Sequence, residues 1–266
     1  MNCNMADDSA HSDPGVPLLV AHRGYAALYP ENTLPSCEAA LRAGACFIEI
    51  DVQLSADGVP VLFHDHNLAR TTGHDALITD VDYAFLQTLD AGERQRLGND
   101  HPFTAIPTLA EFAVLLQQWP RTKAFVEIKE ESLDIFGRQR VLQQILETLT
   151  PVRERCIAIS YDADVLGEIQ AQAGWRTGWV LHRYDDDSHE QARSLSPDYL
   201  ICNYTKLDDD RLWPGPWQWM LYEVTEVELA LQLYQRGAQL IETMTIATLL
   251  EDDILATAAC RQGNDQ

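Results

Sequence analysis

The stretch that decides the fold runs from Phe47 to His64 and reads FIEIDVQLSADGVPVLFH. Its first arm places Glu49 and Asp51 two residues apart among apolar residues, so both side chains point to one face of a strand. The dipeptide Asp57-Gly58 that follows is a strong hairpin signal. We therefore expect the second arm to fold back along the first, which brings the two carboxylates toward His64.

On either side of this hairpin, short β-rich runs alternate with amphipathic helical stretches. The expected strands are Leu18–His22, Phe47–Val52, Ala124–Ile128, Cys156–Ser160, Thr177–Leu181, Tyr199–Cys202, Met220–Val224 and Gln239–Ile241. The expected helices are Leu34–Ala43, Leu109–Trp119, Arg138–Leu149, Ala163–Ala173, Glu226–Gln235 and a last one near Ile246–Ala259. Such alternation predicts parallel βαβ units. Eight strands in 266 residues favour a closed TIM-type (β/α)8 barrel over an open doubly wound sheet.

The chain is expected to form one barrel domain over residues 17–266, preceded by a flexible tail over residues 1–16. Residues 66–106 are polar, contain glycine and show no clear period, so we interpret them as a small insertion after the second strand, over the barrel mouth. The tail has neither the basic start nor the apolar segment of a signal peptide. No apolar run approaches the ~18 residues of a membrane span. These features favour a soluble, cytoplasmic protein.

The charge of the chain restricts its partners. Nineteen basic and 41 acidic side chains give a net charge of −22, which repels nucleic acid and anionic membranes. We therefore expect neither nucleic-acid binding nor stable membrane association. The same charge repels a phosphate-containing substrate unless local positive groups reverse the field. The oligomeric state stays open.

The six cysteines are scattered and include no Cys-x-x-Cys pair. This pattern favours unpaired thiols over a disulfide framework or a zinc site.

Polar side chains gather where predicted strands end. Glu127 lies near the end of its strand, as Glu49 and Asp51 do on theirs, and parallel strands of a barrel end at the same mouth. Carboxylates held together repel one another unless one is protonated or a cation lies between them. Three of them suit one hard divalent cation, Mg²⁺ or Ca²⁺.

Two histidines end neighbouring segments, His22 on the first strand and His64 on the second arm of the hairpin. Beside a metal site, such a pair offers a general base and a general acid that titrate near neutral pH. Arg23 and Lys129 add phosphate-directed positive charge, so the cation and these two residues are expected to form one positive pocket in an acidic protein.

Taken in order, these segments resemble the glycerophosphodiester phosphodiesterase family. The matching segments are His22-Arg23-Gly24, Glu31-Asn32-Thr33, Glu49-Ile50-Asp51, His64-Asp65, Arg70-Thr71-Thr72-Gly73 and Glu127-Ile128-Lys129. The resemblance implies a barrel with a small insertion after the second strand, a divalent cation held by Glu49, Asp51 and Glu127, and acid–base histidines at His22 and His64.

The resemblance weakens toward the C-terminus. The family's Trp-Thr-Val-Asn stretch reads Tyr222-Glu223-Val224-Thr225 here, and its closing Ile-Thr-Asp reads Glu242-Thr243-Met244. These departures affect the pocket, and with it the substrate preference, more than the metal site.

The implied reaction is hydrolysis of small glycerophosphodiesters, such as glycerophosphocholine or glycerophosphoethanolamine, to sn-glycerol 3-phosphate and an alcohol. The cation and Arg23 would bind the non-bridging oxygens, and the resemblance suggests attack by the substrate's own glycerol 2-hydroxyl.

Two alternatives remain. One is a related enzyme that acts on a lipid, such as a lysophospholipase D or a sphingomyelinase D, which the lack of a basic amphipathic helix disfavours. The other is a non-catalytic barrel that binds phosphodiesters, which would be free to lose one of these side chains, whereas this chain keeps the whole set.

Overall fold

The computed structural model describes residues 15–172, 174–207 and 211–260. The predicted flexible tail covers residues 1–16, and residues 1–14 of it lie outside the described part of the chain. Within it, no helix combines the length and the apolar character that crossing a membrane requires.

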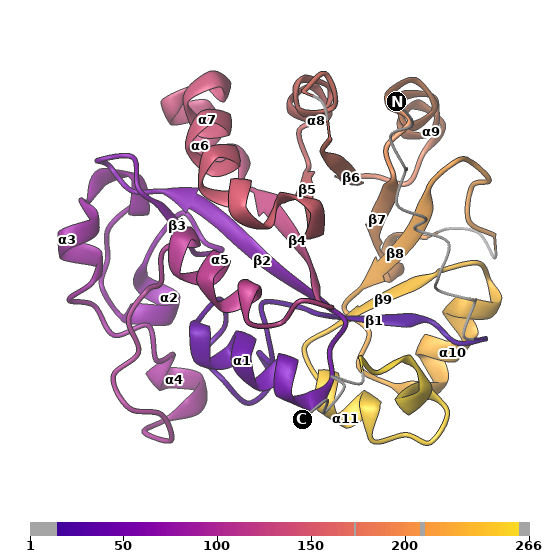
Figure 1. The fold of residues 1–266 in the computed structure, drawn as a ribbon, viewed down its shortest axis with the longest axis horizontal. Coiled ribbons are helices and arrows are strands. Elements are labelled where there is room, and N and C mark those ends of the chain that lie inside the picture. Colours follow the sequence, from indigo (N-terminus) through magenta and orange to yellow (C-terminus); the bar gives the residue numbers. More distant parts are fainter. Residues whose placement is uncertain (1–14, 173, 208–210, 261–266) are drawn as a thin grey trace, which may run out of the picture.

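Eight parallel strands form a closed ring, which confirms the predicted TIM-type barrel (Figure 1). The ring closes because the first strand pairs with both the second and the last, with Val20 opposite Phe47 and Leu18 opposite Leu240. The strands are β1 (Leu18–Ala21), β2 (Phe47–Leu54), β4 (Lys123–Ile128), β5 (Cys156–Ser160), β6 (Arg176–Val180), β7 (Tyr199–Asn203), β8 (Gln218–Tyr222) and β9 (Leu240–Thr243).

Helices surround the strands, as the alternating pattern predicts (Figure 1). They are α1 (Leu34–Ala43), α5 (Leu109–Gln117), α6 (Glu130–Phe136), α7 (Arg138–Leu149), α8 (Ala163–Gln170), α9 (Asp186–Leu195), α10 (Val227–Gln235) and α11 (Ile246–Leu250). Helix α1 begins at Thr33, whose hydroxyl accepts the backbone N–H of Ser36. It ends at Gly44, whose φ of 104° is left-handed. These caps fix where the chain leaves β1 and enters β2.

The hairpin forms as predicted. Strand β3 (Pro60–Leu62) runs antiparallel to β2, with Val52 opposite Leu62, and stands outside the ring of parallel strands. Gly58 takes the positive φ, 86°, that the turn requires. The hairpin carries the chain back toward the barrel mouth and delivers His64 there.

Residues 66–106 form a lobe of short helices beside this hairpin, at the left of Figure 1. They are α2 (Ala69–Thr72), η1 (Ile78–Asp80), α3 (Tyr83–Leu86) and α4 (Arg94–Leu97). The lobe has its own small apolar cluster, which includes Leu68, Ile78 and Leu86 and also takes in Val61 and Phe63 from the hairpin. Apolar packing therefore holds the lobe to β3 and the residue after it.

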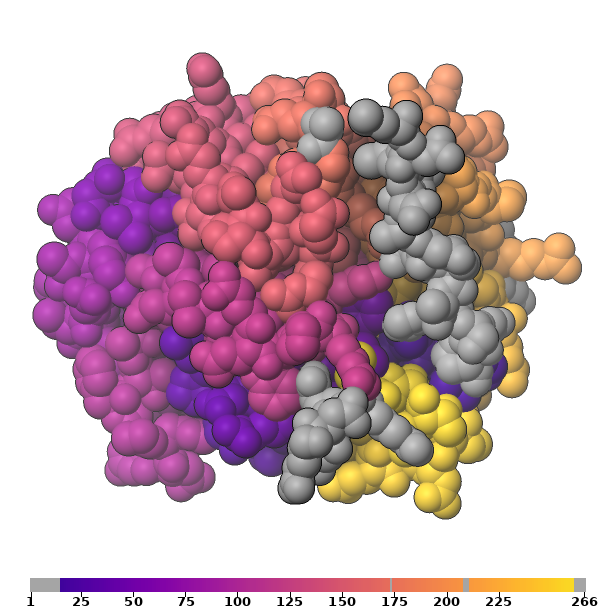
Figure 2. All heavy atoms as spheres, in the orientation of Figure 1, coloured from indigo at the N-terminus to yellow at the C-terminus, as the bar shows by residue number. Residues whose placement is uncertain are grey.

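The expectation of unpaired cysteines is wrong for Cys46 and Cys260, which form a disulfide across 214 residues of sequence. Cys46 directly precedes β2, and the chain after the short helix η4 (Leu255–Ala258) returns to the same end of the barrel. The backbone N–H of Cys260 donates to the carbonyl of Gly44 at 2.8 Å there. Helix α11 also contacts α1, and Figure 2 shows the indigo and yellow ends of the described chain side by side. Barrel closure, which no local spacing reveals, brings the two cysteines together.

Candidate active site

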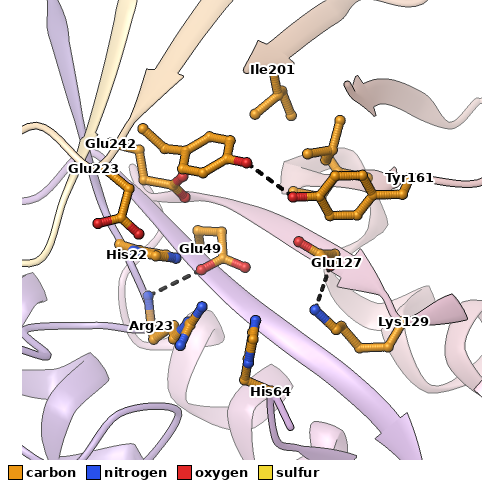
Figure 3. Close-up of a pocket in the computed structure, with 13 residues that line it drawn as sticks. His22, Arg23, Glu49, His64, Glu127, Lys129, Tyr161, Ile201, Glu223 and Glu242 are labelled. Atoms are coloured by element: carbon orange, nitrogen blue, oxygen red, sulfur yellow. Dashed lines mark hydrogen bonds and ion pairs between the residues drawn. The ribbon is translucent and has the colours of Figure 1, made fainter. Parts of the chain in front are cut away.

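A cavity of about 260 Å³ opens at the carboxyl ends of the barrel strands (Figure 3). It is lined by His22, Arg23, Glu49, His64, Glu127, Lys129, Ile159, Tyr161, Val180, Ile201, Tyr222, Glu223 and Glu242. Six of the seven predicted site residues are in this lining. The seventh, Asp51, has a carboxylate oxygen within 4.8 Å of those of Glu49 and Glu127. The structure thus brings all seven side chains to one place.

The three carboxylates come together because of strand register. Asp51 of β2 lies opposite Glu127 of β4, and Glu49 lies two residues earlier on the same face of β2. Asn32 fixes Asp51 with two hydrogen bonds: its side-chain amide donates to the carboxylate at 2.8 Å, and its Oδ1 accepts the Asp51 backbone N–H at 3.0 Å. Asn32 has a left-handed φ of 54°, a conformation that asparagine tolerates better than most residues.

The electrostatics of these carboxylates favour a bound cation. Burial, together with repulsion from Asp51 and Glu242, raises the pKa of Glu49 well above its usual value. Burial also raises the pKa of Glu127, although Lys129 opposes the shift. Burial acts in the same sense on Asp51, but Arg23 and Lys129 outweigh it and hold the pKa of this carboxyl below its usual range. A divalent cation would relieve this repulsion, so the donor set fits one.

The two side chains that are predicted to bind phosphate, Arg23 and Lys129, form ion pairs with these same carboxylates. The Lys129 ammonium lies 2.7 Å from Glu127 and 3.3 Å from Asp51. The Arg23 guanidinium lies 3.1 Å from Asp51 and 2.9 Å from Glu31. Their charges therefore partly compensate the buried acids, which the sequence pattern does not reveal.

The two histidines have different surroundings. His22 is buried, and burial together with the charge of Arg23 lowers its pKa to about 3, so its ring is neutral at neutral pH. The side chain of His64 is one-third exposed, and its Nδ1 lies 2.7 Å from the carboxylate of Asp65. This contact orients the His64 ring and leaves Nε2 as its other proton-exchanging atom.

Ion pairs connect the two histidine regions through the lobe. Arg70 of α2 lies 2.6 Å from Glu31 and 2.5 Å from Asp65. Because Glu31 also binds Arg23, alternating charges run from Arg23 to His64. The lobe therefore helps to position side chains on both sides of the cavity.

Three polar residues of the cavity have no chemical role in the prediction from sequence: Tyr222 and Glu242 enter it only as departures that affect the pocket, and Tyr161 is not singled out. Glu242 of β9 is 3% exposed, and its ligand atom lies within 4.8 Å of those of His22 and Glu49. The signal that identifies it is an acid directly after the apolar Leu240-Ile241 in a barrel strand. The hydroxyls of Tyr161 and Tyr222 lie 3.0 Å apart, and burial raises the pKa of Tyr161 to about 12.

Comparisons with known proteins agree with this geometry. Residues 22–208 match the glycerophosphoryl diester phosphodiesterase family. The chain is 40% identical to Glycerophosphodiester phosphodiesterase 1 of Bos taurus over 92 residues, which are 35% of this chain and 28% of that protein. It is 39% identical over 119 residues to the Probable glycerophosphodiester phosphodiesterase 1 of Mycobacterium tuberculosis, which is 43% of each chain. The matches thus span less than half the length of these two curated relatives.

A solved structure extends the comparison over the barrel. An Oleispira antarctica phosphodiesterase, in complex with the product sn-glycerol-3-phosphate, superimposes with a TM-score of 0.78 at 27% identity. The superposition covers 89% of this chain and 96% of that one. Because the family match extends over more than half of its residues, the chain belongs to the glycerophosphoryl diester phosphodiesterase family.

Proposed function

We propose that the chain is a metal-dependent hydrolase that converts glycerophosphodiesters to sn-glycerol 3-phosphate and an alcohol. The observation that carries the proposal is the group of three carboxylates, Glu49, Asp51 and Glu127, beside two histidines in one cavity. Family membership supports the reaction, and the product bound in the Oleispira antarctica relative supports the substrate class.

Glu49, Asp51 and Glu127 would hold one divalent cation. The donors are all carboxylate oxygens, which suits Mg²⁺ or Ca²⁺. When bound, such a cation stabilises the negative charge that develops on the phosphoryl oxygens.

Arg23 and Lys129 are proposed to bind the non-bridging oxygens of the phosphodiester. Both groups reach Asp51, at 3.1 and 3.3 Å, so a phosphate beside these carboxylates lies within their range. Both are held in place by a second acid, Glu31 for Arg23 and Glu127 for Lys129. This preorganisation means that little side-chain ordering is needed when the substrate binds.

The histidines are proposed to move the protons. His22 is neutral at neutral pH, so it can accept the proton of the glycerol 2-hydroxyl as that oxygen attacks phosphorus. His64, oriented by Asp65, gives a proton to the alcohol oxygen as its bond to phosphorus breaks. Water then opens the cyclic phosphate with the two roles reversed, which restores both rings to their starting states.

The tyrosine wall is proposed to face the alcohol that leaves. Tyr161, Tyr222 and Ile201 line the cavity, and Figure 3 shows Tyr161 and Ile201 on the side away from His64. An aromatic and apolar wall suits the methyl groups of a choline or the carbons of an ethanolamine. Glycerophosphocholine and glycerophosphoethanolamine are therefore the substrates that we propose.

Release of choline and of glycerol 3-phosphate from glycerophosphocholine tests the proposal. Turnover should stop in EDTA and return on addition of Mg²⁺ or Ca²⁺. Glu127→Gln should lower the affinity for the activating cation, whereas the matched variant Asp134→Asn, which changes an exposed acid of α6, should not. Turnover that persists in EDTA, or binding without turnover when the cation is present, contradicts the proposal. Faster release from lysophosphatidylcholine would favour the lipid-directed alternative.

A further inference from the structure

A second group of possible metal ligands lies beside the first. It consists of His22, Glu49 and Glu242, whose ligand atoms are all within 4.8 Å of one another and whose side chains are all buried. They meet because β1 pairs with β2 on one side and with β9 on the other, which brings His22, the residue directly after β1, to Glu49 of β2 and Glu242 of β9. Figure 3 shows His22 and Glu242 close to Glu49.

Two polar atoms of this group have no hydrogen-bond partner within the described part of the chain. They are Oε1 of Glu242 and Nδ1 of His22, and both are shielded from solvent. The two residues are 3% and 8% exposed. Proteins rarely leave such atoms unsatisfied, because burial removes their bonds to water without replacement. Both atoms therefore indicate a missing partner in the cavity.

The distribution of positive side chains around the cavity indicates the charge of the missing ligand. Arg23 pairs with Glu31 and Asp51, and Lys129 pairs with Asp51 and Glu127. Among the described residues no ion pair reaches Glu49 or Glu242, although these carboxylates lie side by side and are 2% and 3% exposed. Arg23 attracts both carboxylates, but its guanidinium is paired with Glu31 and Asp51. Only its backbone N–H reaches Glu49, at 3.1 Å. A cation is the partner that would compensate both buried acids directly.

We propose that His22, Glu49 and Glu242 form a second divalent-cation site that shares Glu49 with the first. The imidazole nitrogen makes this site suited to a transition metal such as Mn²⁺ or Zn²⁺, whereas the first group offers only carboxylate oxygens. Glu242 stands where the family's closing Ile-Thr-Asp pattern has its isoleucine, so this chain's departure from the pattern supplies the third ligand. A carboxylate shared by two cations is the usual bridge of two-metal sites.

The test is the number of Mn²⁺ ions bound by the full chain after removal of metals with EDTA. Equilibrium dialysis with metal analysis should give two ions for the unaltered protein and one for Glu242→Gln. Glu223→Gln is the matched control, because it removes one carboxylate from the same cavity but from an exposed residue outside the ligand group. It should retain two ions. Electron paramagnetic resonance should show coupled Mn²⁺ spins in the unaltered protein and in Glu223→Gln, and uncoupled spins in Glu242→Gln.

A thermal unfolding curve establishes whether the variant is folded. Without metal, Glu242→Gln should melt above the unaltered protein, because it replaces an acid that is costly to bury beside Glu49 and Glu127 by a neutral amide. With Mn²⁺ the order should reverse. If Glu242→Gln does not fold, Glu242→Ile serves in its place, with one ion expected. One ion in the unaltered protein, or two in the Glu242 variant, overturns the proposal. Such a failure leaves the proposed hydrolysis intact, because hydrolysis uses only the first cation.

Discussion

Reduction of the disulfide between Cys46 and Cys260 should destabilise the barrel without changing its chemistry. The disulfide lies where β2 begins, whereas the cavity opens at the carboxyl ends of the strands. A reduced protein that stays folded at 25 °C should therefore hydrolyse substrate at the rate of the oxidised protein. Its resistance to urea and heat should be lower.

The magnitude follows from the length of chain that the disulfide closes. The sequence separation is 214 residues, and the chain-entropy relation for a loop of that size gives about 5 kcal/mol at 25 °C. For a protein of this size, about 2–4 °C of melting temperature corresponds to each kcal/mol, so reduction should lower the melting temperature by about 10–20 °C.

Urea unfolding with and without dithiothreitol measures the effect, and a thiol titration in denaturant establishes that two further thiols appear on reduction. Cys46→Ser is the control, because its stability should not respond to the reductant. Cys37, Cys156 and Cys202 are buried free thiols and offer the reductant no other disulfide among the described residues. A shift below about 1 kcal/mol after complete reduction would refute the reasoning, since the chain-entropy effect would then be absent.

Three further predictions concern the cavity. His22→Ala and His64→Ala should each lower kcat by about 100-fold or more, the usual contribution of a general acid or base. Steady-state kinetics at saturating Mg²⁺ measure this, and a variant that keeps full activity would exclude its residue from proton transfer. Excess Mn²⁺ should inhibit hydrolysis by the unaltered protein, because an ion bound to His22 prevents the ring from transferring protons. Hydrolysis by Glu242→Gln should not be inhibited in this way. Equal inhibition of the two proteins would contradict the second cation site. The pKa of His22 is lowered from 6.5 to about 3, so between these pH values the unfolded chain binds a proton that the folded chain does not, and stability falls as pH falls. From pH 6.5 to 5 this loss of stability reaches at most about 2 kcal/mol. Urea unfolding at both pH values should show a smaller loss for His22→Gln than for the unaltered protein. An equal loss in the two proteins would argue against a buried neutral ring.

Local patterns were sufficient to predict the barrel and to bring the seven predicted site residues to one barrel mouth. Glu49 and Asp51 share a face because of their two-residue spacing, and the turn at Asp57-Gly58 folds His64 back toward them. Both signals act over fewer than about 10 residues, where strand geometry and turn preferences decide the conformation.

Contacts between distant strands were not predictable in the same way. Glu242 meets His22 only because β9 pairs with β1, and Cys260 meets Cys46 only because the chain returns to the start of β2. The partners of Lys129 also depend on register, since Asp51 and Glu127 lie opposite each other on β2 and β4. No periodicity within one segment contains this information.

The pairing of β1 with β9 also has a consequence for the synthesis of the protein. Leu18 and Leu240 are partners, so a chain that emerges from the ribosome carries β1 with one unpaired edge until residues 240–243 have been made. An exposed strand edge invites pairing with other chains, and contacts this distant in sequence form slowly. The arrival of β9 covers that edge and brings Glu242 to the cavity. Protection from aggregation and completion of the site are thus gained in one late folding step.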